Sequence, residues 1–226
     1  MSGGTKINLK KWLLGAALAA CAASVVSADS LELISGASTV TLPGSGGTTT
    51  YQNNNFNGWN IVITAGSSDS PSLTPYGLEL TALVTCSNAS GCASLAVGYS
   101  DTGFTAPVAA NGFEDSYSAT VSGSGSGTTT EYGFASSSNS LFATDLALGS
   151  VGPFTATGGN IAFGGPAISG TYSLTLADVF TAATGPIAFS TDASVTQTPE
   201  PSEALMLGTG LLGLFGLARR KGFNIA

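Results

Sequence analysis

Between residues 29 and 198, apolar and polar side chains alternate in short runs that Gly, Ser, Thr, Asn or Pro residues separate. In one run, Trp59, Ile61 and Ile63 would share one face of an extended chain, because successive side chains of a strand point to opposite faces. The segments with this pattern are 31–33, 59–64, 78–84, 95–99, 117–121, 132–134, 161–163, 172–176 and 187–189. They predict an all-β fold, a single antiparallel β-sandwich of which a jelly roll is one form. Two tracts rich in Gly, Ser and Thr, 44–50 and 122–130, are expected to form flexible loops at its edge.

Charge is distributed unevenly along the chain. All six basic residues lie near the two ends, and residues 29–198 contain no Lys, Arg or His. The same stretch holds eleven of the thirteen acidic residues, since only Glu200 and Glu203 lie outside it. A surface of this sign repels phosphate groups, so nucleic acid and phosphorylated ligands are excluded as partners.

The missing residue types also limit catalysis. A histidine base, a lysine nucleophile, a Ser–His pair and an arginine clamp all need side chains that residues 29–198 lack. Carboxylate chemistry, or a metal held by oxygen ligands, remains open. We therefore expect a protein that is not an enzyme and that holds no cofactor or metal, with a carboxylate-based hydrolase as an alternative.

The N-terminal residues 1–28 have the organisation of a secretory signal. Lys6, Lys10 and Lys11 precede an apolar run at 12–20, and Val26-Ser27-Ala28 ends the segment with small residues. This order predicts a signal helix and cleavage after Ala28. The segment Leu18-Ala19-Ala20-Cys21 also fits a lipobox, in which Cys21 would be acylated; the signal cleaved at Ala28 is favoured.

The C-terminal tail has three parts in a fixed order: Pro199-Glu200-Pro201, an apolar stretch at 204–218, and the basic cluster Arg219, Arg220 and Lys221. A helix of fifteen residues (218 − 204 + 1) is about 22 Å long, short of the roughly 30 Å hydrocarbon core. The segment is thus a marginal transmembrane helix. The basic cluster keeps the last residues in the cytoplasm and places everything before 204 outside.

This tail resembles the sorting signal of the PEP-CTERM proteins of Gram-negative bacteria, and the resemblance covers residues 199–222. It departs from the usual pattern at Thr198 and Glu203. The resemblance implies that an exosortase, a membrane peptidase, recognises the Pro-Glu-Pro triplet and removes the tail. It also implies an exported protein that is transiently anchored in the inner membrane and then acts at the cell surface or in the biofilm matrix, where exopolysaccharide is a potential partner.

Cys86 and Cys92 are the two cysteines that remain after export, and they lie between two predicted strands. A hairpin at this point would bring their Cβ atoms together, and an oxidising compartment would then allow a disulfide. A metal site is the weaker reading, because two thiols without histidine make a poor ligand set.

Three carboxylates are candidates for chemistry. Asp101-Thr102-Gly103 matches the short aspartic-protease motif, but residues 29–198 hold no second copy to complete a dyad. A turn after Tyr99, in which Asp101 caps its own backbone, is the better interpretation. Glu114 and Asp115 would point to opposite faces of a strand, whereas in a loop they would form a solvated acidic segment that Phe104 and Phe113 pin to the core. We assign no catalytic residue.

Aromatic residues near the Asn-rich segment 52–60 suggest a carbohydrate-binding alternative. Tyr51, Trp59 and Tyr76 are the candidate glycan contacts, although the alternation at Trp59 favours a place in the core. The main hypothesis for residues 29–198 is a non-enzymatic surface or matrix domain, and a carbohydrate-binding module or adhesin is the second.

Overall fold

Two six-stranded antiparallel sheets pack face to face in the computed structural model, which confirms the predicted all-β sandwich. The structure describes residues 29–44, 47–68, 77–105, 108, 110–198 and 209–212. The first sheet, here called the β6–β11 sheet, contains in spatial order β2 (Ser38–Pro43), β1 (Asp29–Ser35), β6 (Cys92–Phe104), β11 (Tyr172–Thr184), β8 (Ser126–Ser136) and β9 (Leu146–Phe154). The second, the β5–β12 sheet, contains β10 (Gly158–Gly164), β7 (Phe113–Gly123), β12 (Ile187–Gln197), β5 (Gly77–Cys86), β4 (Trp59–Ser68) and β3 (Thr48–Phe56).

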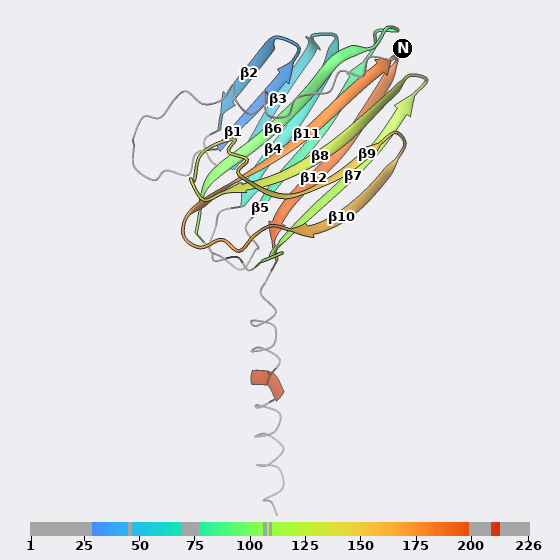
Figure 1. Cartoon of the computed structure of the whole chain (residues 1–226). Helices are drawn as coiled ribbons and strands as arrows, with labels where there is room; N and C mark the ends of the chain where they lie inside the picture. The colour runs from blue at the N-terminus through green and yellow to red at the C-terminus, as the bar shows by residue number, and fades with distance from the viewer. Residues whose placement is uncertain are drawn as a thin grey trace, which may run out of the picture.

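The chain crosses repeatedly between the two sheets. From β5 onward, each odd-numbered strand and the strand that follows it lie in opposite sheets. Figure 1 shows the resulting stack, with β2 and β3 on one side and β9 and β10 on the other. Residues that are distant in sequence therefore meet across the core, as β11 does with β5 and β12 with β8.

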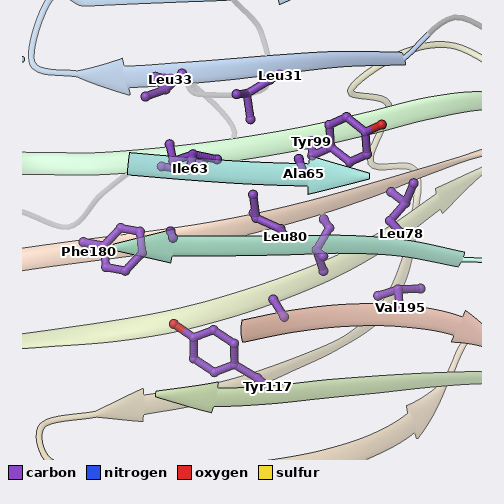
Figure 2. Close-up of a cluster of buried hydrophobic side chains, with 14 of the residues drawn as sticks. Leu31, Leu33, Ile63, Ala65, Leu78, Leu80, Tyr99, Tyr117, Phe180 and Val195 are labelled. Carbon is purple, nitrogen blue, oxygen red and sulfur yellow. The ribbon is translucent and has the colours of Figure 1, made fainter. Parts of the chain in front are cut away.

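Apolar side chains from the inner faces of both sheets form one continuous core. Figure 2 shows Leu31 and Leu33 of β1, Ile63 and Ala65 of β4, and Leu78 and Leu80 of β5 in this cluster. Each pair is separated by two positions, so the period-two pattern of the sequence and the inward face of the strand coincide. Burial of such faces is the main stabilising contribution in a sandwich of this kind.

The Gly/Ser/Thr-rich tracts contribute more strand than we expect from their composition. β3 begins at Thr48, inside the first tract, and only the turn at 124–125 separates β7 from β8 in the second. Thr129 is fully buried in β8. The expectation of flexible loops is wrong for these residues, because threonine is a good strand former and here pairs with neighbouring strands.

Most residues of the two predicted terminal segments lie outside the described part of the chain. The signal 1–28, with Ala28 and Cys21, lies outside the described residues. So do Pro199, Glu200, Pro201, Arg219, Arg220 and Lys221. Of the predicted helix 204–218, the structure describes the helical residues 209–212. Within the described ranges, no helix combines the length and apolar character needed to cross a membrane.

A disulfide links Cys86 at the end of β5 to Cys92 at the start of β6, which confirms the predicted bond. The two strands do not form the hairpin that we expect from the sequence, because they belong to opposite sheets. The bond therefore ties the two layers together at one end of the sandwich. Gly91 makes the connection possible: its φ is +83°, and a Cβ there would lie 2.3 Å from the carbonyl oxygen of Ala182.

The Cys86→Ser/Cys92→Ser double variant should have a free energy of unfolding about 2 kcal/mol lower than that of the wild type. Without the short cross-link, the unfolded chain has more conformational entropy. Urea unfolding, followed by far-UV circular dichroism, measures this difference. Wild-type protein treated with a reductant should show the same loss. Equal stability of the oxidised and reduced wild type would contradict a stabilising role for the bond.

Candidate functional site

Of the two candidate glycan contacts that the structure describes, Trp59 is not on the surface and Tyr51 is half-buried. Trp59 is fully buried, and its Nε1 donates a hydrogen bond of 2.7 Å to the carbonyl oxygen of Ala93. Tyr51 is half-buried against the core, opposite Ile63 of β4, and its hydroxyl accepts a hydrogen bond from Asn53. Tyr76 lies outside the described residues. Trp59 as a glycan contact is therefore wrong, and its alternation with Ile61 and Ile63 correctly indicates a core position.

Asp101-Thr102-Gly103 lies inside β6 and not in a turn after Tyr99. Asp101 is fully buried, and its Oδ1 accepts a hydrogen bond of 2.6 Å from the backbone N–H of Thr102. The expected contact of the aspartate with its own backbone is present, although the strand continues through it. Gly103 donates its N–H to Oδ1 of Asn139 at 2.8 Å. The loop between β8 and β9 therefore holds this end of β6 in place.

Glu114 and Asp115 are adjacent in β7, so the expectation of a solvated loop is wrong. As the strand alternative predicts, they point to opposite faces. Asp115 is 1% exposed, while Glu114 is half-exposed and lies opposite Phe163 of β10. Phe104 and Phe113 are fully buried, and both rings contact Tyr172. They fix the start of β7 to the core, as the sequence suggests.

The inward turn of Asp115 brings it into a group of three buried carboxyls, which we call the carboxyl cluster: Asp115 of β7, Glu131 of β8 and Asp178 of β11. Glu131 and Asp178 are fully buried and lie directly opposite each other on neighbouring strands. Asp115 approaches from the other sheet. The cluster thus lies between the two sheets, where their inner faces meet.

Two glycines provide the space for Asp115. Gly133 of β8 and Gly149 of β9 lie opposite each other, and a Cβ added to either would lie 3.2 Å from Oδ2 of Asp115. Such a distance is tighter than most Cβ contacts, so a larger residue at either position would push against the carboxylate. The absence of side chains at Gly133 and Gly149 leaves the space that the Asp115 side chain occupies.

Hydroxyl groups accompany the cluster but satisfy only part of it. Thr191 of β12 donates a hydrogen bond of 2.8 Å to Oδ2 of Asp178. The hydroxyl of Tyr117 is hydrogen-bonded to that of Thr129. Within the described ranges, both carboxyl oxygens of Asp115 and Oδ1 of Asp178 have no donor from outside the cluster, while the carboxyl of Glu131 has the backbone N–H of Val151 close to it. A proton held between Asp115 and Glu131 would satisfy one oxygen of each.

Burial determines the protonation of the cluster. It raises the pKa of Asp115 and of Glu131, and the nearby charge of Asp115 raises that of Glu131 further, so Glu131 holds the proton. Burial also raises the pKa of Asp178 to about 8, against the lowering effect of the Thr191 hydrogen bond. Desolvation favours the neutral form of a carboxyl, and no cation in residues 29–198 opposes this effect.

The cluster has no arrangement suited to a metal ion. In the part of the chain that the structure describes, no group of three or more His, Cys, Asp or Glu side chains could hold one. Asp115, Glu131 and Asp178 are each at most 1% exposed. The cluster is therefore closed to solvent, and burial favours the protonated form of its carboxyls.

Sequence reasoning missed Glu131 and Asp178, although a signal for Asp178 was present. The alternation of Tyr172, Leu174 and Leu176 continues through Asp178 to Phe180, which assigns the aspartate to the inner face. Glu131 had no such signal, because its neighbours two positions away are Thr129 and Gly133. The meeting of the three carboxyls depends on the pairing of distant strands.

Comparison with known proteins gives limited information. No protein-family model and no curated protein matches the chain. Among solved structures, the CBM22-1–GH10 modules of Clostridium thermocellum xylanase 10B, complexed with xylohexaose, are 14% identical over 68% of this chain and 28% of theirs, with a TM-score of 0.30. The C-terminal CBM6 of LamC from Zobellia galactanivorans is 12% identical over 66% of this chain and 99% of its own, with a TM-score of 0.24.

An isomalto-dextranase of Arthrobacter globiformis T6, complexed with panose, is 19% identical over 70% of this chain and 24% of its own, with a TM-score of 0.24. The chain thus spans about a quarter of the xylanase and isomalto-dextranase chains. Similarities at this level carry no conclusion about the ligand or activity of this chain.

The Gly133→Ala variant should lose about 1–3 kcal/mol of stability, because the new methyl group meets both Asp115 and Val195 at 3.0–3.2 Å. Urea unfolding measures the loss. Gly66→Ala is the matched control in β4, since a Cβ there meets nothing closer than 3.6 Å. If Gly133→Ala were as stable as Gly66→Ala, the space around Asp115 would be large enough for a methyl group, and the predicted steric conflict would be wrong.

Proposed function

We propose that this chain is an exported, non-enzymatic protein of the cell surface or extracellular matrix, sorted by an exosortase-type membrane peptidase through Pro199-Glu200-Pro201. The observation that carries the proposal is the disulfide between Cys86 and Cys92. Structural disulfides form and persist in oxidising compartments and are rare in the cytosol. A domain that closes such a bond between its two layers is suited to folding after export.

The end of the last strand supports the same proposal. The described residues begin at Asp29, already within β1, and β12 ends at Gln197, two residues before Pro199. Removal of either terminal segment would therefore leave every described strand intact. This is what a delivered domain between two sorting signals requires.

The charge of the domain limits its partners outside the cell. Residues 29–198 carry acids but no bases, so anionic polysaccharides and lipid head groups would be repelled. Neutral exopolysaccharide and other matrix components remain suitable partners. Before processing, the apolar stretch 204–218 would hold the chain in the inner membrane.

Carbohydrate binding is a second candidate, and one surface feature favours it. Phe163 of β10 is 63% exposed and Ile161, two positions earlier, is 51% exposed. Phe163 lies opposite the half-exposed Glu114 of β7. An exposed aromatic ring can pack on the C–H face of a sugar, and a neighbouring carboxylate can accept hydrogen bonds from its hydroxyls. This pair replaces Tyr51 and Trp59 as the candidate contacts.

Deletion of residues 199–226 should end surface retention, so that the protein appears in the medium or stays in the periplasm. Replacement of Pro199, Glu200 and Pro201 by alanine should leave an uncut precursor in the membrane fraction, because the apolar stretch is still present. Immunoblots of cell fractions measure both results. Glu203→Ala, outside the triplet, is the control and should behave as the wild type. Unchanged surface retention after the deletion would reject the sorting route.

Binding of the purified protein to an array of neutral and acidic glycans tests the second candidate. We expect neutral glycans to bind and Phe163→Ala to weaken that binding at least tenfold. Val62→Ala removes another exposed apolar side chain, on β4, and should bind as the wild type. An array without signal, from protein shown to be folded, would reject carbohydrate binding and leave the sorting proposal standing.

A further inference from the structure

The carboxyl cluster lies where β7 and β12 of one sheet face β8 and β11 of the other. Its three acids and the hydroxyls of Thr191 and Tyr117 come from all four of these strands. A change of charge at this point would therefore act on the contact between the two layers and not on a single loop.

Every titratable group near the cluster is an acid. Asp115 and Tyr117 face it from β7, Glu131 from β8 and Asp178 from β11. Asp192 of β12, on the exposed face, adds its charge to the environment of Asp178. β9 and β10, which complete this side of the sandwich, contain no ionisable side chain. Ionisation of the cluster would meet only further negative charge.

A second negative charge in the cluster would have no cation close to it, because residues 29–198 contain none. Glu131 and Asp178 are direct neighbours across β8 and β11, and like charges in such a pair destabilise a sheet. Within the described part of the chain, Asp115 and Oδ1 of Asp178 have no donor from outside the cluster, and Glu131 has only the backbone N–H of Val151. An unpaired charge buried in this way is strongly unfavourable, so the strands would have to separate and admit water.

We propose that the carboxyl cluster is a proton-operated latch between the two sheets, which holds the sandwich closed in acid and lets its β7–β10 side open as the external pH rises. An exported domain experiences the external pH directly, so the latch would make its stability respond to the surroundings. The response of the cluster to pH is independent of the sorting route and of carbohydrate binding, whereas its use outside the cell rests on the proposed export.

The direction of the effect follows from proton linkage. The native state holds protons that the unfolded chain releases above about pH 4, where carboxyls ordinarily titrate. Stability is therefore fully present in acid and is lost progressively as the pH rises toward the pKa of Asp178, which burial raises to about 8. Paired carboxylates in most proteins give the opposite dependence below neutral pH.

Thermal unfolding of the purified full chain between pH 5 and pH 9 tests the latch. We expect the Tm of the wild type to fall by about 5–10 °C over this range. The Glu131→Gln/Asp178→Asn double variant keeps the shape of the protonated cluster and should lose at least half of that fall. Glu79→Gln/Asp145→Asn, which changes two exposed acids, is the matched control and should keep all of it.

A second measurement covers the case in which the double variant does not fold. Hydrogen exchange of the wild type, corrected for the intrinsic effect of pH, should accelerate in β8 and β9 at pH 9 relative to pH 5, while β4 and β5 stay protected. A Tm that is constant or rises with pH would overturn the proposal. So would a double variant with the full wild-type dependence, or exchange that accelerates equally in all strands.

Discussion

The packing of two sheets through a core that contains acids but no bases governs the rest of this structure. The apolar faces of β1, β4, β5, β6, β11 and β12 supply most of the core. Asp115, Glu131 and Asp178 lie in the same interior, and residues 29–198 offer no cation to pair with them. Because burial favours the neutral form of these carboxyls, we expect protonation and the packing of the two sheets to be coupled.

The predictable part of the fold is the part that alternates strongly. Trp59, Ile61 and Ile63 define β4 and its inward face from sequence alone, and Cys86 and Cys92 are paired as predicted. β2, β3 and β9 escape prediction because Thr, Asn and Gly dilute their pattern. The sheet order could not be read from the sequence, since it depends on strands far apart in the chain. For the same reason the carboxyl cluster was not foreseen, although Asp178 continues a visible alternation.

Two features of the structure agree with the proposed export and trimming of the chain: the disulfide and the position of the strands between the two terminal segments. The bond between Cys86 and Cys92 joins the two sheets, and structural disulfides are typical of oxidising compartments. The described strands occupy 29–197, between the proposed signal and the proposed sorting tail. A domain of this kind can lose both ends of its translation product and keep its core, which links the fold to the proposed delivery at the cell surface.

The central claim, that this is a delivered domain between two removable signals, is tested most directly by the intact mass of the protein isolated from its native host. The account predicts a chain that begins at Asp29, lacks the apolar stretch 204–218, and is 2 Da lighter than its reduced form because of one disulfide. A chain of all 226 residues, recovered from the cytosol with Cys86 and Cys92 reduced, would contradict it.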